Sequence, residues 1–296
     1  MPVSVHHRAP AKLNLALAVG PPEETGMHPI CSWMVTVSLF DELHLQRLML
    51  DQLSRYAILW HDEAMRCSDI DWSINSDLAV RAHQLLESHV GQRLPIQMKL
   101  SKRIPVGGGL GGGSSNAAAM LRAVNELFEL EISLEELAKL GATLGSDVPF
   151  LVHQGSAMVS GLGDAITRHT QPVELDVVLA FPDASCATGA VYRAFDEHGP
   201  GALQAEAIQA SVDAATPRPV DDLLFNDLAE PAMTMAPAAR EARERLRTLA
   251  ERTVHVTGSG STLFVLCDDP MHAEALANAC TEQLGIPAVH ATFFAG

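Results

Sequence analysis

Basic residues are scarce in this chain. It has 20 Lys and Arg against 36 Asp and Glu, which gives a formal net charge of −16 at pH 7. Binding to nucleic acid requires clustered Lys and Arg that displace the counterions of the phosphate backbone. The negative balance argues against such a surface, so we do not expect nucleic acid as a partner.

Long hydrophobic runs are also absent. No apolar stretch approaches the roughly 20 residues of a membrane-spanning helix, and the first residues lack the apolar core of a signal peptide. The composition of 47% hydrophobic and 19% charged residues is typical of a globular protein. We therefore expect a cytoplasmic protein without a membrane partner. We also expect either a monomer or a weak homodimer.

The cysteines and histidines form no recognisable site. The five cysteines are scattered and odd in number, without a C-x-x-C pair, which argues against a disulfide framework or a zinc site. The thirteen histidines include no H-E-x-x-H pattern. The sequence thus contains no metal-ligand pattern.

A glycine-rich segment at residues 104–119, IPVGGGLGGGSSNAAA, is the most informative feature present. Backbone N–H groups in such a loop can approach an anion because no Cβ intervenes, and the N-terminus of the following helix attracts phosphate. The segment therefore predicts a phosphate cradle, with a flexible linker as the alternative. It is neither a Walker A sequence nor a dinucleotide fingerprint.

Three polar residues follow the glycines, at the positions where helix-capping residues are expected. Ser114, Ser115 and Asn116 precede an apolar helical pattern that extends to Phe128. Either serine hydroxyl could bind a phosphate oxygen or Mg²⁺, whereas capping alone would explain one of them. Lys102 and its neighbours add positive charge ahead of the loop, although such a run is usually a solvated face.

The order of elements predicts an α+β protein with two domains, residues 1–168 and 169–296, and a boundary near 168–172. In the first half, we expect strands at 3–19, 34–40, 42–48, 55–59 and 96–100, and helices at 78–89, 117–128 and 133–144. In the second half, we expect strands at 177–182, 254–266 (two, around a glycine turn) and 288–294, and helices at 189–197, 220–230, 238–250 and 271–284.

Several motifs together resemble the galactokinase, homoserine kinase, mevalonate kinase and phosphomevalonate kinase (GHMP) superfamily. They are residues 9–15 (APAKLNL), the glycine-rich loop and residues 256–261 (VTGSGS). Within the superfamily, the triple-glycine loop and the GSDVP segment at 145–149 are most similar to the kinases of 4-diphosphocytidyl-2-C-methyl-D-erythritol. The resemblance implies a two-domain fold, with an N-terminal domain like domain 2 of ribosomal protein S5 and a ferredoxin-like C-terminal domain.

The resemblance also implies an activity, the ATP- and Mg²⁺-dependent phosphorylation of the substrate's 2-hydroxyl in the non-mevalonate route to isoprenoids. Ser115 is a candidate Mg²⁺ ligand. Asp77 stands where the family commonly has an asparagine, and it could accept a hydrogen bond from adenine but not donate one. The implied ATP-binding residues are Lys102, Pro105, Gly107, Gly108, Gly109, Leu110, Gly111, Gly112, Gly113, Ser114, Ser115 and Asn116.

Phosphoryl transfer to an alcohol needs a group for the hydroxyl proton and a cation near the transferred group. Asp147 follows a Gly-Ser turn and could accept the proton, or it could be an ordinary turn aspartate. Lys12 is a lone cation in an apolar strand, and the resemblance places it beside Asp147. A lysine whose stem lies on an edge strand while its ammonium reaches solvent is the alternative.

The implied substrate contacts are Asn14, Met27, His28, Asp147, Thr188, Gly258 and Gly260. Where the family has Gly-Tyr-His, this chain has methionine before His28, and methionine is a less orienting platform for the cytosine ring than tyrosine. His28 could otherwise be a surface residue, and the two glycines a simple turn. Another small alcohol, homoserine or a mevalonate-like acid, stays open as the acceptor, as does a catalytically silent ligand-binding protein.

Overall fold

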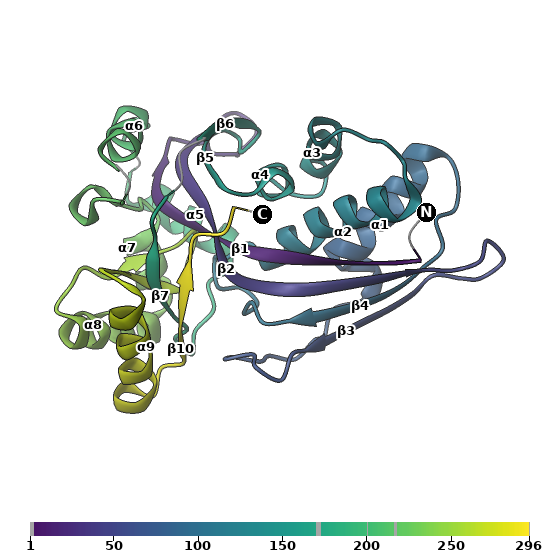
Figure 1. Ribbon diagram of the computed structural model, residues 1–296. Coiled ribbons are helices and arrows are strands. Elements are labelled where there is room, and N and C mark those ends of the chain that lie inside the picture. The colour runs from purple at the N-terminus through teal and green to yellow at the C-terminus, as the bar shows by residue number, and fades with distance from the viewer. Residues whose placement is uncertain (1–2, 170–172, 200, 216–217, 296) are drawn as a thin grey trace. The chain divides into compact units, whose positions relative to one another are not determined.

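The computed structural model describes residues 3–169, 173–199, 201–215 and 218–295 (Figure 1). Its contacts divide the chain into two compact units, each assembled from several segments. Unit 1 comprises Met1–Ala11, Leu39–Val106 and Gly111–Gln154, and unit 2 comprises Lys12–Ser38, Gly107–Leu110 and Gly155–Gly296. Two long paired strands, β1 (Ser4–Val19) and β2 (Ile30–Arg47), contribute residues to both units.

Unit 1 combines strands with a group of helices. Strand β4 pairs antiparallel with the second part of β2 and parallel with β3. Helices α1 and α2 pack against each other and cover one face of these strands (Figure 1). The other elements of unit 1 are β3 (Arg55–Trp60), η1 (Ile74–Ser76), α1 (Leu78–Val90), β4 (Ile96–Lys102), α2 (Gly112–Phe128), α3 (Leu134–Ala142) and α4 (Val148–His153).

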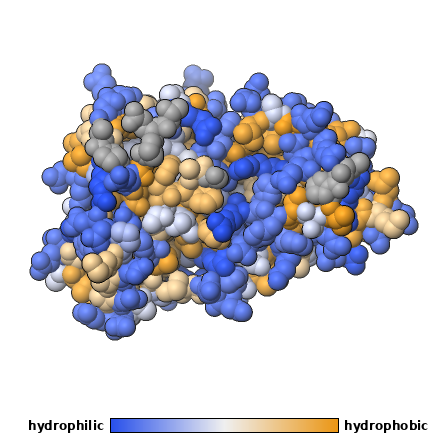
Figure 2. Space-filling model, in the orientation of Figure 1, coloured by the Kyte–Doolittle hydropathy of each residue, from blue (hydrophilic) through white to orange (hydrophobic). Residues whose placement is uncertain are grey.

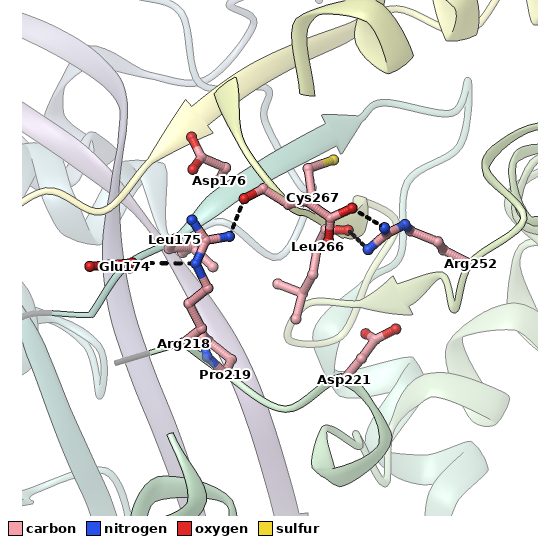
Figure 3. Close-up of a pocket in the computed structure, with 10 residues that line it drawn as sticks. Glu174, Leu175, Asp176, Arg218, Pro219, Asp221, Arg252, Leu266 and Cys267 are labelled. Carbon is pink, nitrogen blue, oxygen red and sulfur yellow. Dashed lines mark hydrogen bonds and ion pairs between the residues drawn. The ribbon is translucent and has the colours of Figure 1, made fainter. Parts of the chain in front are cut away.

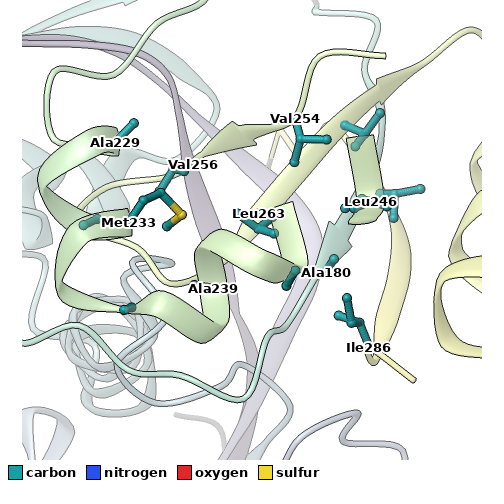
Figure 4. Packing of buried hydrophobic residues seen from close by; sticks show 14 of the residues in the cluster. Ala180, Ala229, Met233, Ala239, Leu246, Val254, Val256, Leu263 and Ile286 are labelled. Atoms are coloured by element: carbon teal, nitrogen blue, oxygen red, sulfur yellow. The ribbon is translucent and has the colours of Figure 1, made fainter. Parts of the chain in front are cut away.

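Unit 2 contains an antiparallel sheet in the order β10-β7-β9-β8. Strand β5 pairs with the first part of β2 and with β6. The core joins Ala180, Val256 and Leu263 of the sheet to Met233 and Leu246 of the helices (Figure 4). The elements are β5 (Ser156–Gly161), β6 (Ala165–His169), β7 (Asp176–Ala180), α5 (Thr188–Glu197), α6 (Ala205–Ala214), η2 (Asp221–Leu223), α7 (Ala229–Met235), α8 (Pro237–Ala250), β8 (His255–Val256), β9 (Leu263–Cys267), α9 (Pro270–Leu284) and β10 (Ala288–Thr292).

Most of the expected elements occur, and two expectations were wrong. The strands expected at 34–40 and 42–48 form the single strand β2, because the carboxylate of Asp41 is satisfied inside the protein and does not end the strand. The helix expected at 220–230 is the short turn η2 followed by α7. Between them, Asn226 accepts from the N–H of Leu228 and donates to backbone oxygens of Val256 and Gly258.

The expected domain boundary is not decided by these units. Part of it, residues 170–172, lies outside the described residues, and the division into 1–168 and 169–296 remains a prediction. In the described part of the chain, no helix is both long and apolar enough to cross a membrane. Hydrophilic residues cover most of the face shown in Figure 2.

A buried carboxylate fixes the segment that enters the glycine-rich loop. Asp41 Oδ2 accepts from Lys102 Nζ at 2.6 Å and from Asn116 Nδ2 at 3.0 Å, and Oδ1 accepts from the backbone N–H groups of Arg103 and Ile104 at 2.6 and 2.8 Å. A buried carboxylate is tolerated only when it is paired and hydrogen-bonded in this way. The segment is thereby tied to strand β2 and helix α2.

This network predicts a large loss of stability in the variant Asp41→Ala. Its free energy of unfolding should fall by about 3–5 kcal/mol, because Lys102 is left as a buried charge without its carboxylate partner. Urea unfolding followed by circular dichroism measures the change. Glu63→Ala is the control, since this carboxylate is 76% exposed and 3.4 Å from Arg103, and it should cost less than about 1 kcal/mol. Equal losses in the two variants would contradict the assignment.

Candidate active site

The glycine-rich loop lies against a second glycine turn of unit 2. The N–H of Thr262 donates to Gly108 O at 3.2 Å. A Cβ on Gly109, whose φ is +77°, would lie 2.3 Å from Thr257 O, so no other residue fits there. The structure thus brings Gly258 and Gly260 of the second turn together with residues 107–110.

Helix α2 begins earlier than expected. Its N-cap is Gly111, with φ +69°, and the N–H of Ser115 already donates to Gly111 O at 2.8 Å. The expectation that Ser114, Ser115 and Asn116 cap the helix was therefore wrong, because the glycines let the chain enter the helix three residues sooner. Helix capping therefore does not account for the presence of either serine. The first N–H groups of α2 have no acceptor within the helix.

The polar side chains of this first turn have other partners. Ser115 Oγ is buried and donates to Pro10 O at 2.7 Å, and Asn116 donates to Asp41. Ser114 lies beside the turn that precedes Asp147, since its Oγ is 3.6 Å from the position of a Cβ on Gly145. The start of α2 and that turn are therefore neighbours in unit 1.

Two residues discussed for ATP binding have structural roles in unit 1. Lys102 is buried, its ammonium is paired with Asp41, and its backbone oxygen accepts from the N–H of His61 at 2.8 Å. Asp77 is the N-cap of α1, where it accepts from the N–H of Ala79 at 2.9 Å and from Trp72 Nε1 at 3.1 Å. Contacts of either residue with ATP remain predictions.

Lys12 is held inside unit 2. The residue is 4% exposed, so the alternative that its ammonium reaches solvent was wrong. Nζ donates to Asn14 Oδ1 at 2.5 Å, and a Cβ on Gly258 would lie 3.1 Å from Nζ. The Lys12 N–H donates to Leu110 O at 2.9 Å. The ammonium is thus placed at the contact between the two glycine turns.

Asp147 is half-buried at the N-cap position of α4 but makes no capping hydrogen bond with its side chain. The next residue, Val148, packs closely against α3, because a Cβ on Gly141 would lie 2.6 Å from Val148 Cγ1. Asp147 belongs to unit 1 and Lys12 to unit 2. Their meeting at one site therefore remains a prediction.

His28 is held by helix α5. Its Nε2 lies 2.8 Å from Asp196 Oδ1, and its ring centroid is 4.9 Å from that of Tyr192 and 6.1 Å from that of Phe195. The side chain of His28 is 6% exposed, so the surface alternative was wrong, whereas Met27 is exposed. The sequence analysis missed Phe195 and Asp196, although residues three and four positions after Tyr192 share its helix face.

The second glycine turn carries further polar contacts. Thr188 Oγ1 lies 3.0 Å from Ser259 Oγ, so Thr188 is beside Gly258 and Gly260. Cys186 is also close to this turn, since its Sγ would lie 3.5 Å from a Cβ on Gly260. Burial raises the pKa of the Cys186 thiol, which disfavours its thiolate form.

A separate cavity of about 110 Å³ in unit 2 contains none of the predicted site residues (Figure 3). Arg218 pairs with Glu174, and Arg252 pairs with Asp268, so both arginines are already neutralised on its wall. Among the described residues, no group of three His, Cys, Asp or Glu could hold a metal ion. The cavity is lined by Glu174, Leu175, Asp176, Arg218, Pro219, Asp221, Arg252, Leu266, Cys267 and Asp268.

Comparison with known proteins identifies relatives along nearly the whole chain. The family model "GHMP kinases N terminal domain" matches residues 77–155, and "GHMP kinases C terminal" matches residues 205–286. The 4-diphosphocytidyl-2-C-methyl-D-erythritol kinase of Mycobacterium leprae is 35% identical over 269 residues, covering 89% of this chain and 81% of that protein. The enzyme of the same name from Bacillus pumilus is 33% identical and covers 88% and 86%.

Solved structures agree with these relatives. A crystal structure of 4-(cytidine 5'-diphospho)-2C-methyl-D-erythritol kinase is 32% identical, with a TM-score of 0.76 over 99% of this chain and all of that one. Homoserine kinase from Cytophaga hutchinsonii is 18% identical with a TM-score of 0.67, covering 99% of this chain and 95% of that one, and shares the fold. The predicted two-domain α+β fold of GHMP kinases is thus confirmed. The chain belongs to the GHMP kinase family, and its 30–35% identical relatives place it with the 4-diphosphocytidyl-2-C-methyl-D-erythritol kinases.

Proposed function

We propose that this chain is an ATP-dependent kinase that phosphorylates the 2-hydroxyl of 4-diphosphocytidyl-2-C-methyl-D-erythritol. The choice of substrate rests on the names of its relatives. The observation that carries the proposal is the buried ammonium of Lys12, held at the contact between the glycine-rich loop and the turn at Gly258. A cation beside a phosphate cradle is what transfer of a phosphoryl group requires.

The glycine-rich loop and the start of α2 would bind the phosphates of ATP. Backbone N–H groups of residues 107–113 and the positive end of the helix dipole favour an anion there. Mg²⁺ commonly uses few protein ligands together with substrate phosphates. The hydroxyl of Ser115, which keeps oxygen lone pairs after donating to Pro10 O, suits such a metal. The bound metal would neutralise charge on the β- and γ-phosphates.

Asp147 and Lys12 would act on the acceptor and on the transferred group. The oxygen of the substrate's 2-hydroxyl forms a bond to the γ-phosphorus, and the bond from that phosphorus to the bridging oxygen of ADP breaks. The carboxylate of Asp147 accepts the hydroxyl proton. The ammonium of Lys12 stabilises the negative charge that the phosphoryl oxygens carry during the transfer.

The cytidyl group would be recognised around His28. Asp196 and the rings of Tyr192 and Phe195 fix the imidazole of His28, and the nitrogen that does not contact Asp196 would bond the base. Thr188 and Asn14 remain further predicted substrate contacts. The exposed side chain of Met27 would lie against the ring in place of the family's tyrosine.

An acceptor panel tests the proposed function. Purified protein is incubated with ATP, Mg²⁺ and one of three alcohols, the cytidyl substrate, homoserine or mevalonate, and release of ADP is measured. We expect the highest kcat/KM with the cytidyl substrate. A preference for homoserine or mevalonate would overturn the choice of acceptor, and no release of ADP with any of them would favour a silent ligand-binding protein.

Removal of the proposed base should slow turnover strongly. Asp147→Asn should lower kcat by about 10²–10⁴-fold, because the amide cannot take the hydroxyl proton, while the affinity for ATP stays nearly unchanged. Steady-state kinetics and ATP titration by calorimetry measure the two effects. Glu135→Gln, an exposed acid in the first turn of α3, is the control and should behave like the parent. Near-normal turnover of Asp147→Asn would remove Asp147 from the mechanism.

Restoring the family's tyrosine should strengthen binding of the cytidyl substrate. Met27→Tyr should lower its KM roughly three- to tenfold, because a stacked aromatic pair contributes about 0.5–1.5 kcal/mol, and the KM for ATP should not change. Met49→Tyr, at another exposed methionine, is the matched control. An unchanged KM in Met27→Tyr would place the base elsewhere.

A further inference from the structure

Lys12 is one end of a chain of buried hydrogen bonds. Its Nζ donates to Asn14 Oδ1 at 2.5 Å, Asn14 Nδ2 donates to Ser32 Oγ at 2.8 Å, and Ser32 Oγ donates to Ala16 O at 2.8 Å. Lys12, Asn14 and Ser32 are 4%, 2% and 0% exposed. This series of hydrogen bonds lies entirely within unit 2.

Ser32, at the other end of this series of hydrogen bonds, determines which atom donates and which accepts at Asn14. A serine hydroxyl has a single proton, and in Ser32 that proton is directed to Ala16 O, which can only accept. Ser32 Oγ is therefore an acceptor toward Asn14, and the NH₂ group of the amide must face it. The Oδ1 atom of Asn14 then faces Lys12.

Without this constraint, the amide of Asn14 would have two orientations of nearly equal shape. The orientation with NH₂ toward Lys12 would set a donor against an ammonium, which has donors only. In a buried site the unfavourable electrostatics are strong, since little water screens them. The ammonium would then move away from the amide, and a small displacement of a charged group is enough to reduce stabilisation of a transition state.

We propose that Ser32 is a positioning residue for phosphoryl transfer, because it sets the orientation of Asn14 and thereby the position of the Lys12 ammonium. The inference rests on the proposed function of Lys12. The amide of Asn14 is neutral, so it orients the ammonium without adding a charge of its own.

Single substitutions of Ser32 give the first test. Ser32→Ala should lower kcat about tenfold, equivalent to about 1.4 kcal/mol, with an unchanged KM for ATP. Ser32→Thr keeps the hydroxyl and should retain kcat within about twofold. The control is Ser156→Ala, which removes another buried hydroxyl of unit 2, the acceptor of Trp33 Nε1, and should leave kcat unchanged. A loss of kcat in Ser156→Ala equal to that in Ser32→Ala would overturn the proposal.

A double-mutant cycle separates positioning from packing. A carboxylate has two acceptor oxygens and no donor, so in the Asn14→Asp background either orientation offers Lys12 an acceptor. There, adding Ser32→Ala should change kcat by less than about twofold. If Ser32 only fills space, the tenfold loss will recur in the Asn14→Asp background, and the proposal fails.

A crystal structure of Ser32→Ala decides the inference independently of activity. Lys12 Nζ should lie beyond hydrogen-bond distance from the Asn14 side chain, and retention of the contact seen in the parent would overturn the proposal. If the parent protein releases no ADP with any acceptor, the proposed function fails, while this structural comparison still tests the role of Ser32.

Discussion

A backbone contact between two glycine turns of unit 2 holds together the residues on which the proposed site depends. Thr257 O occupies the space in which a Cβ of residue 109 would lie, and a Cβ on Gly258 would in turn lie 3.0 Å from Gly109 O. Because neither position accommodates a side chain, segments about 150 residues apart in the sequence touch backbone to backbone. Lys12 reaches the same place through its N–H, which donates to Leu110 O. The loop, the turn and the ammonium therefore meet where neither glycine turn has room for a side chain.

The two buried lysines, Lys12 and Lys102, differ in the groups that their ammonium groups contact. Lys102 pairs with the buried carboxylate of Asp41, so its charge is neutralised, and the pair ties β4 to β2 and α2. Lys12 Nζ donates to the neutral amide of Asn14 and lies beside Gly258 of the second glycine turn. Lys102 thus belongs to a buried network of unit 1, whereas Lys12 lies beside the glycine turns of unit 2 where phosphate binding is proposed.

The sequence was sufficient to predict what depends on local chemistry. The glycine-rich loop, the helix that follows it and a cation alone in an apolar strand are each visible within a few residues. The capping position was mispredicted because glycine conformations with positive φ, not polar side chains, start α2. Strand β2 was divided in two because the partners of Asp41 lie some 60 residues away. Such long-range hydrogen bonds leave no local pattern.

The partners of His28 also lie too far away in the sequence to be predicted from it. They bear on the replacement of the family's tyrosine by Met27. Asp196, which bonds the imidazole, is 168 residues away in the sequence, and no spacing rule connects the two. Met27 is exposed, while the ring of His28 is enclosed by side chains of α5. The orientation of His28 therefore comes from α5 and not from its neighbour in the sequence. Replacement of tyrosine by Met27 thus alters the stacking platform proposed for the base but leaves the hydrogen-bonding group in place.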